Sequence, residues 1–368
     1  MKALLLSGSL GMGHDVVAEA CANSLRSRDW STETLDAMRM LGPGGFGLGQ
    51  AAFRGMLAVP GLFDALHFAA FRPGRLPALL ADRVSRRKIV PRLRDYLDAN
   101  PADLAISAFA SGASAVSWLA DRYPVMSHMV ICTDVTPHRL WVHPHVDLYL
   151  VTSAVAEAAV RRFQPQARVL VVPGPVRPGF YQPPSQAEAR GGLGVPVAER
   201  CVLLMSGGWG LGPVAAAAEA LAKAGVHVLA VAGHNTRLER RLRAAAQRQP
   251  RVRPFGFTLE IPKLMAAADM VVTGAGADTC LEARTIGRPL LLLDVLQGHG
   301  RDNLQHELEL GDAWVTSAGA ADVARTALAM LDELKPPLPG PTRSQAEWEA
   351  AFESALAVVG LATGPGQG

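Results

Sequence analysis

A histidine follows the first glycine-rich turn of the chain, in the sequence Gly11-Met12-Gly13-His14. The apolar run before this turn and the alanine-rich segment after it predict a strand that leads through the turn into a helix. Because the positive end of the helix dipole disfavours imidazolium, we expect His14 to be neutral at pH 7 and able to accept a proton. The position therefore predicts a general base, with a histidine that only caps or packs the helix as the alternative.

A second polar group follows the apolar run at 126–132 and contains Thr133, Asp134, His138 and Trp141. Open α/β sheets bind their ligands at the carboxyl ends of their strands, so these side chains are candidates for contacts to a substrate. Asp134 is placed to orient either His14 or an acceptor. His138 with His143 and His145 raises the alternative of a metal site, but the spacing matches no strong ligand pattern and we expect no metal.

A similar turn follows the apolar run at 270–273 in the second half of the chain. Gly276 and the amides before Thr279 are suited to hold a pyrophosphate, and Glu282 lies one helical turn further on. A carboxylate at that position can accept hydrogen bonds from a ribose diol. A solvated helix residue is the alternative for Glu282, since one small-residue loop is weak evidence.

The elements that must position these residues repeat within the chain. Residues 4–20 align with residues 203–219 at an offset of 199, and each copy reads as strand, glycine loop and helix. Further apolar runs alternate with helix-like segments, and they lie at 103–107, 126–132, 147–152, 168–172, 226–232, 270–273 and 290–293. This alternation predicts an α/β fold with parallel sheets in two Rossmann-like domains.

A proline-rich stretch divides the two halves and predicts a linker over 172–196. We expect an N-terminal domain over 1–175 and a C-terminal domain over 176–335. A last helix over 343–360 is expected to pack back on the N-terminal domain.

Composition excludes several classes of protein. The chain is 49% hydrophobic and 19% charged, with no apolar run near the roughly 20 residues of a membrane span. Its start lacks the features of a secretory signal, and four scattered cysteines in apolar contexts suggest reduced core thiols. We therefore expect a cytoplasmic protein without a nucleic-acid partner.

Charge is concentrated in residues 51–95, which hold nine basic and three acidic residues, a local net charge of +6. The same segment has an aromatic-rich apolar run that includes Phe63 and Phe68. An apolar surface beside Arg86, Arg87 and Lys88 predicts attachment to an anionic membrane surface, at about 1 kcal/mol per basic side chain. The alternative is that the phenylalanines fill the core of the N-terminal domain and the basic residues form a solvated helix face.

Motifs along residues 1–315 resemble the glycosyltransferases of family 28, most closely their monogalactosyldiacylglycerol synthase and processive diacylglycerol glucosyltransferase branch. The family's glycine-rich turn with histidine is matched at 11–14, and its T-D-x-x-x-H-x-x-W element by Thr133, Asp134, His138 and Trp141. Its G-x-P-V-R-x-x-F element is resembled by Gly174, Pro175, Val176, Arg177 and Phe180. The C-terminal signature is resembled by Gly256–Thr273, Gly274, Ala275, Gly276, Ala277, Thr279, Glu282 and Asn303.

The resemblance implies the GT-B fold, in which two Rossmann-like domains face each other across a cleft. The N-terminal domain over 1–175 would then bind the acceptor, and the C-terminal domain over 176–335 the nucleotide-sugar. It implies an inverting transfer from a UDP-sugar without a cofactor or metal, to a lipid or small-molecule acceptor. His14 would be the base with Asp134 beside it, and Gly11, Gly13, His138 and Trp141 would meet the acceptor. The implied donor contacts are Gly207, Gly208, Gly210, Phe255, Gly256, Phe257, Gly276, Thr279, Glu282, His299 and Asn303.

Two departures from the family pattern leave the sugar open. The family's Lys-Pro is replaced by Gly274-Ala275, and its Gln-Glu pair, a donor-sugar contact, by His299-Gly300. Three alternatives stand beside transfer to a membrane lipid such as diacylglycerol. They are transfer to a soluble natural product, a UDP-sugar 2-epimerase-like isomerase and a nucleotide-sugar binding protein that has lost transfer.

Overall fold

A computed structural model describes residues 1–8, 13–42, 76–205, 212–295, 299–334, 338 and 340–361. Contacts within the chain divide it into two compact units. Unit 1 comprises Met1–Pro175, Gln297–His299 and Gln345–Gly368, and unit 2 comprises Val176–Leu296 and Gly300–Ser344.

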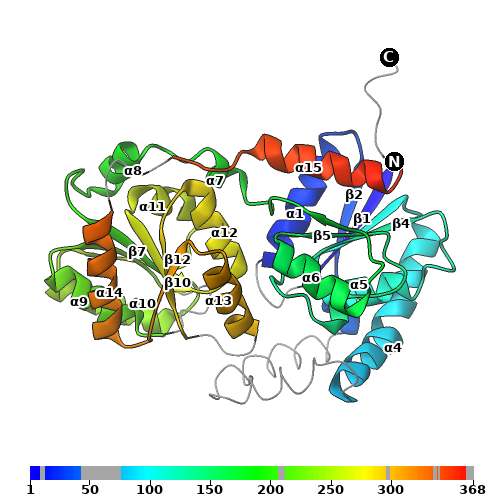
Figure 1. Cartoon of the computed structure of the whole chain (residues 1–368), viewed down its shortest axis with the longest axis horizontal. Coiled ribbons are helices and arrows are strands. Elements are labelled where there is room, and N and C mark those ends of the chain that lie inside the picture. The colour runs from blue at the N-terminus through cyan, green and yellow to red at the C-terminus, as the bar shows by residue number, and fades with distance from the viewer. Residues whose placement is uncertain are drawn as a thin grey trace. The chain divides into compact units, whose positions relative to one another are not determined.

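Unit 1 is built on a parallel six-stranded sheet in the order β2-β1-β3-β4-β5-β6 (Figure 1). Its strands are β1 (Lys2–Ser7), β2 (Ser31–Asp36), β3 (Leu104–Ser107), β4 (Ser127–Ile131), β5 (Leu148–Val151) and β6 (Val169–Val171). Its helices are α1 (Gly13–Arg26), α4 (Leu76–Ala99), α5 (Ala110–Ser117), α6 (Ala154–Phe163) and α15 (Gln345–Val358), with single turns η1 (Arg39–Leu41) and η2 (Arg139–Trp141). The inner strands are almost wholly apolar because helices cover both faces of a parallel sheet.

The last helix, α15, packs on unit 1 against α1 (Figure 1). Trp348 and Phe352 lie in the same buried cluster as the apolar face of α1. The Trp348 indole donates to the Ser24 hydroxyl at 2.9 Å, and Glu349 accepts from Ser24 at 2.8 Å and from Arg28 at 2.6 Å. The helix thus adds apolar burial and a polar anchor to the first domain of the chain.

Unit 2 has a second parallel six-stranded sheet, in the order β12-β11-β10-β7-β8-β9. Its strands are β7 (Cys201–Met205), β8 (His227–Val231), β9 (Val252–Phe255), β10 (Met270–Gly274), β11 (Leu290–Leu293) and β12 (Ala313–Thr316). Its helices are α7 (Pro178–Tyr181), α8 (Gln186–Leu193), α9 (Val214–Lys223), α10 (Thr236–Arg248), α11 (Ile261–Ala267), α12 (Ala277–Ile286), α13 (His299–Glu309) and α14 (Ala320–Glu333). The predicted pair of Rossmann-like sheets is confirmed.

Each sheet has one point where its strand order reverses. In unit 1 the chain turns back between β1 and β3, and in unit 2 between β7 and β10. Doubly wound sheets bind ligands at the carboxyl ends of the strands that flank this point, because the loops there diverge and leave space. The turns before α1 and α12, which carry the predicted site residues, follow β1 and β10.

The stretch predicted as a linker over 172–196 is instead largely folded into unit 2, as α7 and α8. Ser185 begins α8 with a capping box in which its side chain and that of Glu188 exchange hydrogen bonds with the backbone. Arg190 of α8 is buried and pairs with Asp269 at 2.7 Å. Polar residues that looked like a linker therefore cap and anchor a helix.

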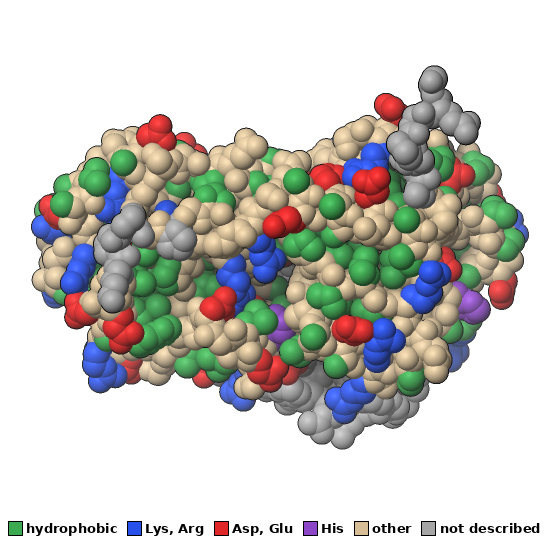
Figure 2. Space-filling view, turned by 45° about the horizontal axis from the view of Figure 1, so that its top comes forward, with side chains coloured by type: hydrophobic (Ala, Val, Ile, Leu, Met, Phe, Trp, Pro, Cys, Tyr) green, Lys and Arg blue, Asp and Glu red, His purple; other side chains and the backbone are tan. Residues whose placement is uncertain are grey.

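The described surface carries charges of both signs. Figure 2 shows acidic and basic side chains interspersed among apolar ones over the face in view. All four cysteines are buried and free, in agreement with the expected core thiols. Within the described ranges, no helix is both long and apolar enough to cross a bilayer.

Candidate active site

His14 lies in the first turn of α1, at the carboxyl end of β1. Its Nδ1 is 2.9 Å from the carbonyl oxygen of Ala108, which follows β3, and 2.9 Å from the Thr133 hydroxyl, which follows β4. A carbonyl only accepts hydrogen bonds, so Nδ1 carries the proton and Nε2 keeps the lone pair. This tautomer leaves Nε2 as the atom that can take a proton from a substrate.

Packing fixes the plane of the His14 ring. Phe109 meets the imidazole edge-to-face with ring centroids 4.9 Å apart. A Cβ at Gly8 would overlap the Phe109 ring, so only glycine fits at the end of β1. The Ser7 hydroxyl donates to the Asp15 carboxylate and ties the end of the strand to the start of the helix. The histidine is therefore held by strand, helix and aromatic ring together.

Two residues of the second polar group lie beside His14: Thr133, described above, and Trp141, whose ring centroid is 6.3 Å from that of His14. The Trp141 indole donates to Asp134 Oδ2 at 2.7 Å, and Nε2 of His138 lies 3.5 Å from the same oxygen. Trp141 is only 1% exposed, so it holds Asp134 rather than presenting a surface to an acceptor. The groups at His14 Nδ1 are the Ala108 carbonyl and Thr133, which the sequence analysis had not assigned to orient the base.

In unit 2, a hydrogen bond from α13 fixes the loop between β10 and α12. Asn303 of α13 is buried, and its amide donates to the Ala275 carbonyl at 3.0 Å. Gly276 precedes α12 without a side-chain cap, so the first amides of the helix have no side-chain acceptor at that position. Asn303 thus shapes the loop that was predicted to meet a diphosphate, and Thr279 lies in the first turn of the helix.

Glu282 lies on α12 and is buried, with 8% of its surface exposed. Arg177 Nη2 donates to its Oε1 at 3.2 Å. Burial raises the pKa of this carboxyl to about 7; Arg177 acts against the rise and Asp278 adds to it. A buried carboxylate with spare acceptor capacity is suited to bind hydroxyl groups. Arg177 belongs to the predicted G-x-P-V-R-x-x-F element, but no role was predicted for it.

An aromatic pair lies at the carboxyl ends of β8 and β9. Phe257 is 47% exposed and stacks on the exposed His234, with ring centroids 4.2 Å apart and planes 15° apart. Phe255 is partly buried against the core, and the backbone at Gly256 approaches the Glu239 carboxylate. Phe257 is therefore the member of the predicted 255–257 group whose ring is open to a ligand, and His234 was missed.

Several predicted residues cannot be placed. Those outside the described residues are Gly11, Phe63, Phe68, Gly207, Gly208 and Gly210. Gly13 is the first residue of α1 and His299 the first of α13. Where side chains are described, no group of three or more His, Cys, Asp or Glu residues is arranged to hold a metal ion.

The basic residues predicted to meet a membrane lie on α4. Arg86, Arg87 and Lys88 are exposed. The Arg86 guanidinium lies 4.8 Å from the centroid of the Trp118 ring, and Trp118 is 50% exposed. An exposed indole beside cationic side chains is typical of a surface that meets lipid head groups. Trp118 was not among the residues predicted to contact a membrane.

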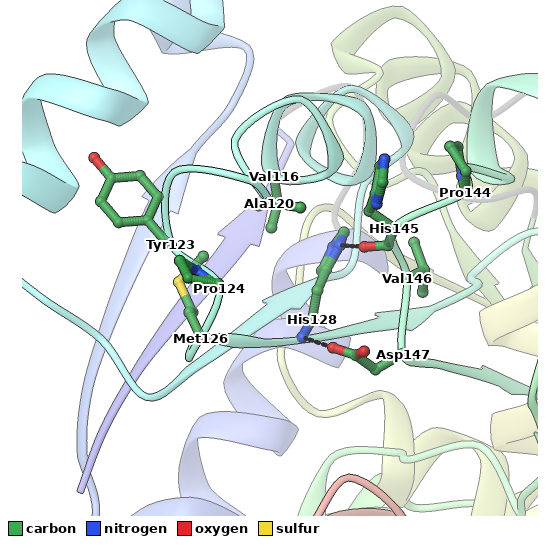
Figure 3. Close-up of a pocket in the computed structure, with 10 residues that line it drawn as sticks. All are labelled: Val116, Ala120, Tyr123, Pro124, Met126, His128, Pro144, His145, Val146 and Asp147. Atoms are coloured by element: carbon green, nitrogen blue, oxygen red, sulfur yellow. Dashed lines mark hydrogen bonds between the residues drawn. The ribbon is translucent and has the colours of Figure 1, made fainter.

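A pocket of about 240 Å³ lies at the other end of the unit 1 sheet, around the start of β4 and β5 (Figure 3). His128 lines this pocket, and its Nδ1 lies 3.2 Å from the His145 carbonyl oxygen (Figure 3). Its Nε2 lies 3.0 Å from the Ser107 hydroxyl. Burial lowers the pKa of His128 to about 3. Both ring nitrogens have partners and the ring stays neutral, so His128 offers no open nitrogen to take a proton from a substrate.

Two family models match the chain. Residues 14–172 match the model described as monogalactosyldiacylglycerol (MGDG) synthase, and residues 213–326 match the glycosyltransferase family 28 C-terminal domain. A probable monogalactosyldiacylglycerol synthase of Nicotiana tabacum is 35% identical over 193 residues, which are 49% of this chain and 36% of that protein. The chain thus spans little more than a third of the length of this relative.

Solved structures share the fold over nearly the whole chain. MurG of Acinetobacter baumannii aligns with a TM-score of 0.60 and 13% identity, over 98% of this chain and 99% of that chain. Arabidopsis thaliana UGT89C1 complexed with UDP aligns with a TM-score of 0.59 and 14% identity, over 99% and 95%. A UDP-N-acetylglucosamine 2-epimerase aligns with a TM-score of 0.56 and 13% identity, over 98% and 97%. The predicted GT-B fold is confirmed.

Proposed function

The chain belongs to the glycosyltransferases of family 28, with an N-terminal half of the MGDG synthase type, and on this premise we propose that it transfers a sugar from a UDP-sugar to an acceptor hydroxyl. The sugar is a hexose or N-acetylhexosamine, and the acceptor is a membrane lipid such as diacylglycerol. The observation that carries the proposal is the oriented His14, whose proton on Nδ1 leaves Nε2 free to act as a base.

His14 is proposed to start a single displacement. The acceptor oxygen attacks the anomeric carbon, its proton passes to Nε2, and the bond from the anomeric carbon to the UDP oxygen breaks. Attack from the side opposite to UDP inverts the configuration at that carbon. General-base catalysis of this kind contributes about 10²–10⁴-fold to the rate.

The donor is proposed to bind at the switch point of the unit 2 sheet. Glu282 accepts hydrogen bonds from the ribose diol, and the exposed ring of Phe257 lies where the family resemblance puts uracil. The uncapped amides of α12 and the loop that Asn303 holds receive the diphosphate, so that its charge is met without a metal ion. Partial burial of this site strengthens each of these polar contacts.

The lipid acceptor is proposed to be reached at a membrane surface. The name of the Nicotiana tabacum relative contains diacylglycerol as the acceptor moiety. Arg86, Arg87 and Lys88 are exposed and supply positive charge for anionic head groups. Arg86 lies against the half-exposed Trp118, which supplies an apolar anchor. We propose peripheral attachment of a cytoplasmic protein to the inner face of the cell membrane through this part of α4 and α5.

A panel of UDP-sugars tests the proposal, incubated with the protein with and without lipid extract. A transferase releases UDP and labels a lipid only when the extract is present. Interconversion of donors without an acceptor would show an isomerase, and binding without any product would show a nucleotide-sugar binding protein. Labelling of a water-soluble acceptor in place of lipid would move the assignment to a natural-product transferase.

A further inference from the structure

The side chain of Arg177 links the start of α7 to α12 within unit 2. It is the N-cap residue of α7, directly after the boundary between the two units, and its side chain reaches α12. Its guanidinium lies 5.0 Å from the centroid of the Phe180 ring, and its buried Nε has no hydrogen-bond partner among the described residues. An arginine whose donors are not fully used is held here by one carboxylate and one aromatic ring.

The Arg177 contact divides the Glu282 carboxylate into two unlike oxygens. Oε1 accepts from Nη2 at 3.2 Å, while none of the described residues donates to Oε2. A carboxylate has about four acceptor sites, so most of its capacity is unused. Arg177 therefore holds Glu282 through Oε1, and Oε2 can accept hydrogen bonds from a ligand.

The charges that face Glu282 come from two elements. Arg177, before α7, is the positive group, and Asp278, one turn earlier on α12, is a negative group that opposes ionisation of Glu282. Since burial also penalises the carboxylate, Arg177 is the contact that favours its charged form. A charged acceptor makes hydrogen bonds roughly twice as strong as a neutral one.

We propose that Arg177 is a positioning residue for nucleotide binding: it holds Oε1 of Glu282, favours the charged carboxylate, and leaves Oε2 to accept hydrogen bonds from the ribose diol. The inference rests on the proposed function, in which Glu282 binds ribose. Arg177 acts through Glu282 and need not touch the nucleotide itself.

The test is calorimetric titration of UDP between pH 5.5 and 9 on the full chain and its variants. Wild type should bind more tightly as the pH rises through about 7, where Glu282 ionises. Arg177→Gln should bind UDP about tenfold more weakly at pH 7.5. Its affinity should recover only at a pH about one unit or more higher, because the opposite charge that lowered the carboxyl pKa is gone.

Three further variants separate this role from a structural one. Arg177→Lys restores a positive charge and should return the pH midpoint toward wild type. Glu282→Gln removes the part of the pH dependence that belongs to this carboxylate and leaves that of the UDP phosphates. Arg200→Gln breaks the exposed pair between Arg200 and Asp332 in the same unit and should leave the midpoint unchanged.

The outcomes distinguish the two claims. If folded wild type does not bind UDP at any pH, the proposed function fails. If wild type binds but Arg177→Gln keeps the wild-type midpoint, or weakens binding equally at every pH, the positioning role is overturned while the function stands.

Discussion

Glu282→Gln should make unit 2 more stable at high pH while it weakens UDP binding. The pKa of this carboxyl is raised from 4.5 to about 7, chiefly by burial. The folded state therefore binds the proton more tightly than the unfolded state, and stability is lost as the pH rises from about 4.5 to about 7. A shift of this size lowers the free energy of unfolding by about 3 kcal/mol at pH 8. Glutamine does not titrate, so the variant does not lose this stability.

Hydrogen exchange of the core amides of β7 and β10, followed by mass spectrometry, measures the opening free energy of unit 2. Comparing variant and wild type at each pH removes the pH dependence of the intrinsic exchange rate. The variant should gain about 2.5 kcal/mol relative to wild type between pH 5 and pH 8. Its affinity for UDP should fall by about 1.5–3 kcal/mol, because a charge-assisted acceptor is lost.

Glu199 provides a control with the opposite sign. Hydrogen bonds from Arg251 and, to a smaller extent, from His227 lower the pKa of this partly exposed carboxyl. The stability that ionised Glu199 contributes is therefore present above its ordinary pKa and is lost on acidification. Glu199→Gln should therefore not gain stability as the pH rises. A difference between Glu282→Gln and wild type that is flat from pH 5 to pH 8, or that falls, would refute the account of Glu282.

Three other predictions follow from the site and the surface. His14→Ala should lower turnover at least about a hundredfold with nearly unchanged UDP affinity, measured by UDP release and titration; wild-type turnover would remove His14 from the mechanism. EDTA should leave activity intact in the same assay, and activity that depends on added magnesium or manganese would contradict the metal-free mechanism. Sedimentation with vesicles should increase with anionic lipid, decrease with salt, and weaken when Arg86, Arg87 and Lys88 are changed to serine; protein that stays in solution with anionic vesicles at low salt would favour a soluble acceptor.

The sequence predicted the inner strands well because burial on both faces makes them continuously apolar. β3, β4 and β5 lie within predicted runs, and β1 overlaps the strand predicted at the start of residues 4–20 but begins two residues earlier. β2 was missed because it is an edge strand of mostly polar residues, S-T-E-T-L-D, and most of it is partly or fully exposed. β9 and β12, at the two edges of the other sheet, were missed as well.

The sequence predicted which residues belong to the candidate site, but not which atoms of these residues contact one another. When residues 4–20 are aligned with 203–219, Pro213 stands opposite His14. The repeat therefore marks His14 as a position where the chemistry of the two halves differs. The partner of its Nδ1 is the Ala108 carbonyl, and no sequence pattern marks which backbone oxygen will face a ring. The pairing of Arg177 with Glu282 joins positions 105 residues apart, so only the fold reveals it.

Inverting transfer to a lipid is tested most directly by the configuration of the product. The protein is incubated with an α-linked UDP-sugar labelled with ¹³C at the anomeric carbon and with diacylglycerol in anionic vesicles, and the lipid fraction is read by NMR. His14 acting as the base of a single displacement predicts a β-linked glycolipid formed in step with UDP release. An α-linked glycolipid, or an epimerised sugar nucleotide formed without labelled lipid, would contradict it.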